Sequence, residues 1–294
     1  MRYTLKEFQA EYPDDSSCLA AIMQQQYGGT RFVCPGCGVE ASFHQMSKRR
    51  AYACQECGHH IYPCVGTIFE KSRTELSLWF YAMYLMTSTR HGVPAKELER
   101  QLGVTYKCAW RMAHELRKLM AAADGTEGPL SGHVEIDETY IGGHNIGKGW
   151  KRRRENKTIV MGIVERGGRI VAAPIPEVKH RTVVPIIEQN VAPGTTISTD
   201  ENRVYSILQV SPYKHGRVNH SVKEWVKGIH HTNSLEGHWS LLKRGIRGTH
   251  THVSPKHLWK YVSEFSFRRN YRHSHQAMFN RLVSSFSLPR LVET

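Results

Sequence analysis

The expected fold is decided by three consecutive stretches of the chain: HVEIDETYIGG (residues 133–143), KTIVMGIVERGG (157–168) and RIVAAPIPE (169–177). All three are rich in β-branched and apolar residues, and a pair of glycines closes the second stretch, so they predict an antiparallel meander of three strands. Four further elements follow along the chain: a helix at 180–191, a strand at 195–201, and helices at 233–247 and 254–272. This order predicts an α/β (α+β) fold in which helices flank a mixed sheet.

Four cysteines near the amino terminus are spaced as metal ligands. Cys34, Cys37, Cys54 and Cys57 form the pattern C-x2-C-x16-C-x2-C. Two such pairs present four thiolates in the tetrahedral arrangement that structural zinc prefers, and the metal supplies folding energy that a small segment lacks. The pattern predicts a zinc ribbon with a structural Zn²⁺ in residues 1–70; buried or redox-active thiols are the alternative interpretation.

The next segment is expected to be helical. Between residues 74 and 123 apolar residues recur at spacings of three and four. Within it, PAKELERQLGVTYKCAWRMAHELRK (94–118) places two helices around a turn at Gly103, which is the spacing of a helix-turn-helix. In that interpretation the second helix presents Tyr106, Lys107 and Arg111 to the major groove of DNA. An ordinary helical hairpin is the alternative.

The chain carries a large excess of positive charge. Its 294 residues include 40 Lys and Arg against 26 Asp and Glu, a formal net charge of +14. This surplus predicts a polyanionic partner, either nucleic acid or an anionic membrane surface, and it fits poorly with an enzyme for small molecules. The longest apolar stretch, LWFYAMYLM (78–86), is far shorter than the roughly 20 residues of a membrane-spanning helix. The amino terminus resembles no secretion signal, so we expect a cytoplasmic protein with no membrane partner.

One segment concentrates the cations. HNIGKGWKRRRENK (144–157) carries six Lys or Arg residues against one Glu. Such a composition is typical of an exposed loop that neutralises DNA phosphates without reading the base sequence. We expect Lys151, Arg152, Arg153 and Arg154 to contact DNA; a plain solvated loop is the alternative.

Three acidic residues are placed to form a cation site. Asp137 follows the apolar run HVEI, Asp200 follows TTIST, and Glu236 lies on a predicted helix. If the two strands are neighbours, the three carboxylates can converge, and such a cluster repels itself unless cations bind. Oxygen ligands with open positions suit Mg²⁺ or Mn²⁺, and two such ions support phosphodiester chemistry. Taken singly, each residue could equally be a solvated carboxylate or a helix cap.

Taken together, these features resemble a known family. The resemblance rests on the cysteine pairs and on four further stretches: GTIFEKSRTELSLWFYAMYLM (66–86), EIDETYIGG (135–143), STDE (198–201) and HTNSLEGHWSLLKRGIRGTHTHVS (231–254). Over about residues 12–272 the chain is similar to bacterial insertion-sequence transposases of the ISXO2-like family, which carry a zinc ribbon and a DDE catalytic domain. The resemblance implies an RNase H-like catalytic domain in residues 131–275, in which the strands that carry the two Asp residues are neighbours. A C-terminal tail (276–294) would follow.

The resemblance also implies the roles of individual residues. Asp137, Asp200 and Glu236 correspond to the three acidic residues of the family, with 35 residues (201–235) between the last two. Lys243, seven residues after Glu236, corresponds to the basic residue that touches a DNA phosphate.

The third acidic position has a second candidate. Asn233 lies one helical turn before Glu236 on the same face, so it is the alternative metal ligand or a substrate contact. A carboxylate binds a divalent cation better than a neutral amide, and we therefore expect Glu236 to be the ligand. Trp239 and Lys243 share the face of Glu236 and are expected to lie beside the DNA. Glu138 is expected on the strand face opposite to Asp137.

The expected function is transposition. The protein would bind the ends of its insertion element, hydrolyse a phosphodiester to free a 3'-hydroxyl, and join that hydroxyl to target DNA. Two Mg²⁺ or Mn²⁺ ions would be held, with Asp137 bridging them and Asp200 and Glu236 binding one each. The expected partners are double-stranded DNA, as terminal inverted repeats and as target, and further copies of the chain in a homodimer or larger synaptic multimer at the bacterial nucleoid. An RNase H-like nuclease that cuts without joining and a domesticated, zinc-dependent DNA-binding regulator are the alternatives.

Overall fold

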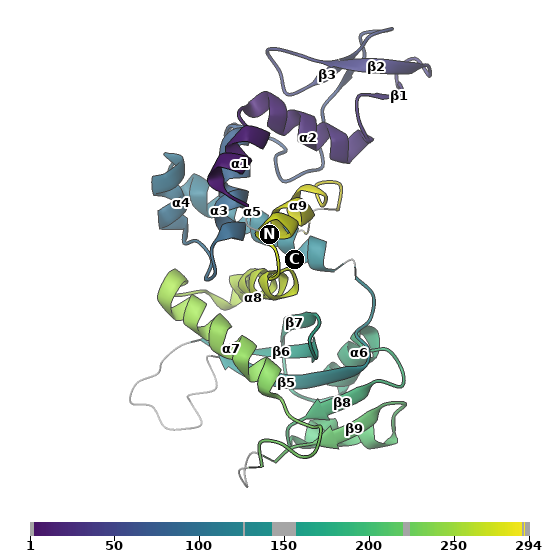
Figure 1. Cartoon of the computed structure of the whole chain (residues 1–294), viewed down its shortest axis with the longest axis vertical. Coiled ribbons are helices and arrows are strands. Elements are labelled where there is room, and N and C mark those ends of the chain that lie inside the picture. Colours follow the sequence, from purple (N-terminus) through teal and green to yellow (C-terminus); the bar gives the residue numbers. More distant parts are fainter. Residues whose placement is uncertain (1–2, 126, 143–156, 220–223, 290, 292–294) are drawn as a thin grey trace. The chain divides into compact units, whose positions relative to one another are not determined.

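The computed structural model describes residues 3–125, 127–142, 157–219, 224–289 and 291 (Figure 1). The chain forms two compact units, Met1–Gly125 together with Tyr271–Thr294, and Thr126–Asn270. The C-terminal stretch, expected as a tail after residue 275, belongs to the first unit and contains helix α9 (His275–Val283). None of the described helices is both long and apolar enough to cross a membrane.

The first unit combines a small antiparallel sheet with helices. The strands pair in chain order: β1 (Arg31–Val33), β2 (Glu40–Gln45), β3 (Tyr52–Cys54) and β4 (His60–Ile61). The helices are α1 (Leu5–Glu11), α2 (Asp15–Tyr27), α3 (Leu76–Ser88), α4 (Ala95–Leu102), α5 (Tyr106–Asp124) and α9. Inside the sheet the rings of Phe32 and Phe43 stack with centroids 4.3 Å apart. Strands of two to six residues bury little apolar surface, so this sheet needs a further source of stability.

Helices α4 and α5 are joined by a tight turn at Gly103, as both the helix-turn-helix and the helical-hairpin interpretations predict. Gly103 ends α4 in the left-handed conformation (φ 65°), and the Thr105 side chain caps α5 by accepting the Cys108 N–H. Tyr106 and Lys107 are exposed at the start of α5, as the groove-binding interpretation requires. Arg111 is also exposed, and its guanidinium donates to Ser72 Oγ at 3.2 Å and lies over the Trp79 ring.

The second unit is built on a mixed five-stranded sheet. Its strands are β5 (His133–Ile141), β6 (Thr158–Glu165), β7 (Ile170–Ile175), β8 (Thr196–Thr199) and β9 (Lys214–Arg217), in the spatial order β7-β6-β5-β8-β9. Strands β5, β6 and β7 form the predicted antiparallel meander, while β8 runs parallel to β5 and β9 parallel to β8. The strand of Asp137 and the strand that precedes Asp200 are therefore neighbours, as the resemblance implies.

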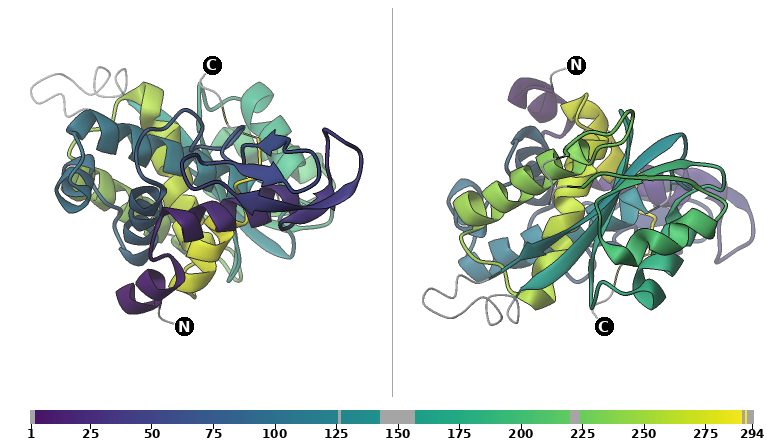
Figure 2. Two further views of the ribbon diagram at one scale, coloured as in Figure 1. Left: turned by 90° about the horizontal axis from the view of Figure 1, so that it is seen from above. Right: turned by 90° about the horizontal axis from the view of Figure 1, so that it is seen from below.

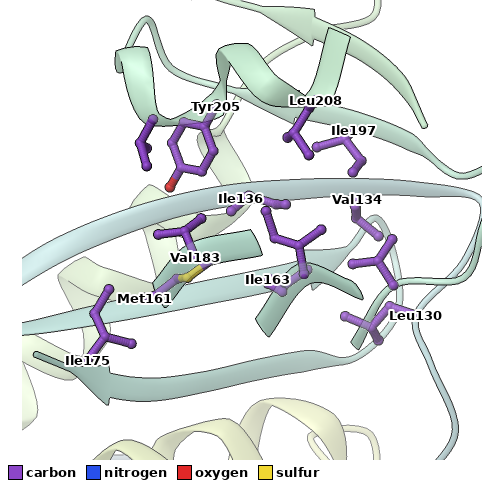
Figure 3. Close-up of a cluster of buried hydrophobic side chains, with 13 residues drawn as sticks. Leu130, Val134, Ile136, Met161, Ile163, Ile175, Val183, Ile197, Tyr205 and Leu208 are labelled. Atoms are coloured by element: carbon purple, nitrogen blue, oxygen red, sulfur yellow. The ribbon is translucent and has the colours of Figure 1, made fainter. Parts of the chain in front are cut away.

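Helices cover both faces of this sheet: α6 (His180–Asn190), the 3₁₀ helix η1 (Arg203–Val210), α7 (Asn233–Gly245), a π-helical turn (Ile246–His250) and α8 (Pro255–Asn270). On one face Ile136, Met161 and Ile163 pack with residues of α6 and η1 (Figure 3). On the other face Val160 and Val164 pack with α7 and α8. Figure 2, in the view from below, shows the strands running between α7 and the α6–η1 segment. The predicted mixed sheet flanked by helices is confirmed.

Candidate active site

Asp137 lies in the middle of the sheet, on the face covered by α7. Its Oδ2 accepts a hydrogen bond from Trp239 Nε1 at 2.9 Å. The residue opposite Asp137 on β6 is Gly162. A Cβ atom at Gly162 would lie 2.6 Å from Cη2 of Trp239 and 2.9 Å from Cδ2 of Leu235. The absence of a side chain at Gly162 therefore lets α7 approach the sheet closely enough for its indole to reach Asp137.

We expect Gly162→Ala to push α7 away from the sheet and to weaken the Trp239–Asp137 hydrogen bond. Overpacking of this kind lowers the free energy of unfolding by about 1–3 kcal/mol, which urea titration can measure. The matched control is Gly237→Ala on α7, where a Cβ atom meets nothing within 4 Å. That control should be neutral or stabilising by up to about 1 kcal/mol. Equal stability of the two variants would contradict the close approach.

Asp200 is held by a hydrogen-bonded chain that begins on β5. Asp200 Oδ1 accepts the backbone N–H of Asn202 at 3.0 Å. The Asn202 side-chain amide donates to Glu138 Oε1 at 2.7 Å, and the Tyr205 hydroxyl donates to Glu138 Oε2 at 2.7 Å. Glu138 thus points away from the face of Asp137, as strand alternation predicts, and it fixes the loop that carries Asp200.

The carboxylates around Asp137 change its acidity. Burial, together with the charges of Glu138 and Asp200, raises the pKa of Asp137 to about 7, and the hydrogen bond from Trp239 opposes this shift. On α7, burial and the charge of Arg247 lower the pKa of Lys243, and the Asp137 carboxylate opposes that shift. The site is therefore a concentration of negative charge with one partly buried ammonium within electrostatic reach.

Glu236 and Asn233 lie at the start of α7, one turn apart, and both are exposed. Thr232 Oγ1 donates to Glu236 Oε1 at 3.3 Å. Among the described residues, only the four cysteines bring three or more metal-ligating atoms within 4.8 Å of one another, so the three acidic residues lie farther apart than that. The structure places Asp137 on β5 and Asp200 directly after the neighbouring strand β8, close enough for their charges to interact, and it places Glu236 on the helix that covers this face of the sheet.

Glu135 anchors α7 and was not singled out in the sequence. Its buried carboxylate accepts the backbone N–H of Ser234 at 2.8 Å and that of Leu235 at 3.3 Å, and the Ser234 hydroxyl donates to it at 2.9 Å. Arg166 Nε also donates to it at 3.0 Å. A carboxylate at a helix start satisfies free N–H groups and is favoured by the helix dipole. Its position two residues before Asp137, on the same strand face, was the available sequence signal.

We expect Glu135→Gln to lower the free energy of unfolding by about 3 kcal/mol, because the amide turns an N–H toward donors and leaves Arg166 without its counter-charge. Thermal unfolding with calorimetry would measure this change. As a control, Glu177→Gln removes only ion pairs to the exposed Lys179 and Arg181 and should cost less than about 1 kcal/mol. A similar small cost for both variants would refute the anchoring role of Glu135.

The cysteines form a second candidate centre, in the first unit. The ligand atoms of Cys34, Cys37, Cys54 and Cys57 all lie within 4.8 Å of one another. Cys34 Sγ and Cys57 Sγ are 3.7 Å apart, which agrees with two sulfurs bound tetrahedrally to one zinc at about 2.3 Å each. The Gly36 N–H also points at Cys34 Sγ, at 3.3 Å. The cluster therefore fits a structural zinc ion, as predicted.

Two stretches of the chain match known transposase domains. Residues 13–60 match the transposase zinc-ribbon domain, and residues 129–270 match the ISXO2-like transposase domain. The chain belongs to the ISXO2-like transposase family. The match to the transposase domain spans β5 to α8 and includes Asp137, Asp200 and Glu236.

Two curated relatives carry related names. An uncharacterized protein in transposable element ISH50 of Halobacterium salinarum is 28% identical over 254 residues, which is 80% of this chain and 84% of the relative. An uncharacterized transposase-like protein of Haemophilus influenzae is 28% identical over 102 residues, which is 35% of this chain and 81% of the relative.

The remaining predicted DNA contacts divide into two groups. Lys151, Arg152, Arg153 and Arg154 lie outside the described residues. Lys243 and Trp239 are described, and both lie on α7 near Asp137.

Proposed function

We propose that this family member is a DNA transposase that hydrolyses a phosphodiester at each end of its insertion element and joins the freed 3'-hydroxyl to target DNA. The observation that supports this proposal is the position of Asp137 on β5 and of Asp200 directly after β8, the parallel neighbour of β5, with α7, the helix of Glu236, hydrogen-bonded to β5. Acidic residues from separate elements that converge on one patch suit the transfer of a phosphoryl group between oxygens.

The donor set fits divalent cations. The carboxylate oxygens are hard ligands. Burial is the main cause of the raised pKa of Asp137, and the charges of Glu138 and Asp200 add to it, so a divalent cation there would offset a local excess of negative charge. Asp137, Asp200 and Glu236 would hold the two Mg²⁺ or Mn²⁺ ions, with Asn233 as the alternative third ligand. When bound, such ions lower the pKa of the attacking water or hydroxyl and stabilise the leaving oxygen.

The protein's own residues then orient this chemistry. The Trp239 indole fixes one carboxylate oxygen of Asp137, and the Glu138–Asn202 hydrogen bond holds the Asp200 loop. Lys243 is proposed to contact a DNA phosphate beside the scissile bond, since its ammonium lies within electrostatic reach of Asp137.

The proposed partners are DNA and further copies of the chain. With a net charge of +14, the protein has the charge to neutralise many phosphates. The zinc ribbon and the exposed start of α5 would bind the inverted repeats at the element ends, and a homodimer or larger multimer would hold two ends together. The proposed location is the bacterial cytoplasm, at the nucleoid.

A cleavage and joining assay tests the proposal. The zinc-loaded full chain is incubated with labelled duplexes that carry both flanks of its gene, with Mg²⁺ or Mn²⁺. The expected products are new 3'-hydroxyl ends and covalent joints to target DNA. Cleavage without joints would favour the RNase H-like nuclease, and tight binding without either product would favour a DNA-binding regulator.

A further inference from the structure

A hollow of about 200 Å³ lies at the end of β5, on the side of the second unit where α7 ends. Its lining comes from four segments: the end of β5 with Gly142, the residue that precedes β6, Lys243 near the end of α7, and the π-helical turn with the residues that follow it. Ile141 on its wall lies on the same strand face as Asp137, four residues further along, which is about 13 Å at 3.3 Å per residue. The hollow is therefore a neighbour of the proposed catalytic carboxylates and is distinct from them.

Cations gather around this hollow. Lys157, Lys243 and Arg247 all line it, and His252 adds a fourth nitrogen-bearing side chain. Among the described lining residues there is no Asp or Glu. Burial lowers the pKa of Lys243, and the charges of Arg247 and Lys157 lower it further, which shows that both of these charges act on the Lys243 ammonium. Like charges held this close are destabilising unless an anion binds between them.

The remaining walls are apolar. Tyr140 contributes a partly exposed aromatic ring, and Ile141, Ile246 and Val253 contribute aliphatic surface. A site that binds only a phosphate does not need an aromatic ring and aliphatic side chains. Cations beside an aromatic ring and aliphatic surface are instead the combination that binds unpaired nucleotides, because the base stacks while the phosphates pair with Lys and Arg.

The backbone of this wall is strained. The π-helical turn Ile246–His250 ends at Thr251, whose φ of 63° and ψ of −56° are disfavoured for a β-branched residue. Both π-helical turns and strained β-branched residues concentrate at functional sites, where the fold maintains a costly conformation because a ligand needs it. Here the strained turn brings Ile246, Arg247 and Thr251 to one wall of the hollow.

We propose that this hollow binds one unpaired nucleotide of the DNA strand that is processed at Asp137, with the base against Tyr140 and Val253 and its phosphates on Lys157, Lys243 and Arg247. Its volume of about 200 Å³ gives room for a single base. This inference rests on the proposed function and adds to it a base that leaves the duplex next to the scissile bond.

The test uses 2-aminopurine, whose emission rises when it leaves the base stack. Element-end duplexes carry it singly at each position near the bond that the full chain cleaves, and binding is measured without divalent cation other than zinc. With the wild-type protein we expect the 2-aminopurine fluorescence to rise several-fold at one position. The rise should be lost in Tyr140→Ala and kept in Tyr140→Phe, because phenylalanine retains the aromatic ring. Arg247→Ala should weaken DNA binding about tenfold. It should also lower the slope of log affinity against log salt concentration by about one, because one phosphate contact is lost.

The matched control is Arg244→Ala, which removes an exposed cation from the last turn of α7 that does not line the hollow. It should keep the fluorescence rise. Cleavage and joining with no rise at any position, or a rise that persists in Tyr140→Ala, would overturn the nucleotide site while leaving the transposase proposal standing. If Arg247→Ala lost DNA binding but the wild-type protein gave no fluorescence rise, the hollow would be only a phosphate contact. That result would likewise overturn the proposal.

Discussion

Asp137→Asn is expected to lower the rates of DNA cleavage and strand transfer by at least about 10³-fold while the protein stays folded. Asparagine keeps an oxygen that can accept from Trp239 Nε1, so α7 should remain docked on the sheet. It removes the negative charge that the proposed cations need, and a neutral amide binds Mg²⁺ more weakly. Timed assays of 3'-end formation and of joined product measure both steps.

The same variant should be at least as stable as the wild type. The pKa of Asp137 is raised to about 7 in the folded chain, whereas an unfolded chain has a value of about 3.9. Between these two pH values the folded chain therefore holds a proton that the unfolded chain has lost. Stability from this group therefore falls as the pH rises through that window. Without divalent cation other than zinc, the melting temperature of Asp137→Asn relative to the wild type should increase from pH 5 to pH 8.

A matched control separates this effect from a general loss of acidic charge. Glu188→Gln changes an exposed carboxylate on α6 and should keep full activity and an unchanged pH dependence of melting. If Asp137→Asn retained cleavage within a few-fold of the wild type, Asp137 would not be a catalytic residue.

Zinc removal is the second change with a large expected effect. A structural zinc contributes on the order of 10 kcal/mol, and strands β1 to β4 have little core of their own. Cys54→Ser, or a strong chelator, should therefore unfold the ribbon. Hydrogen exchange would show loss of protection in β1–β4 and retained protection in β5 and β6, which lie in the other compact unit. Zinc content should fall from one ion per chain to near zero.

The control for this experiment is another cysteine of the same unit. Cys108 lies outside the four-sulfur cluster, and its sulfur is 3.3 Å from Thr74 Oγ1. Cys108→Ser preserves a hydrogen-bonding group there and should keep one zinc and a protected ribbon. Protection of β1–β4 in a zinc-free Cys54→Ser chain would show that the ribbon is stable without metal.

Local sequence patterns predicted the elements and the zinc centre. The spacing of Cys34, Cys37, Cys54 and Cys57 suffices for tetrahedral ligation, because the ligands of each pair lie within one tight turn. The meander followed from β-branched runs separated by turn residues. The tail beyond residue 275 was not recognised as helical, although α9 places Met278, Phe279 and Leu282 in the core of the first unit. A helix of nine residues has too few turns to show a clear apolar periodicity in the sequence. The surface that it packs against is formed by residues far away in the chain, so the local sequence does not reveal it.

The roles of Glu135, Glu138 and Gly162 depended on the tertiary structure. In the sequence Glu135 and Glu138 are two more acids beside Asp137, and Gly162 is a weak point in an apolar strand. Their roles become visible only once β5 is paired with β6 and β8. Glu135 then holds α7, and Glu138 holds the Asp200 loop. Gly162 makes room for the Trp239 ring.

The sequence by itself determined the types of element, the zinc ligands, the positive charge and the family, because these follow from composition and from the spacing of neighbouring residues. The tertiary structure alone decided which acids face α7, how closely Trp239 approaches Asp137, and that Tyr140, Lys157 and Arg247 surround one hollow. The physical reason is that pKa shifts, helix anchoring and pocket shape arise from contacts between segments far apart in the chain, which spacing along one segment does not encode.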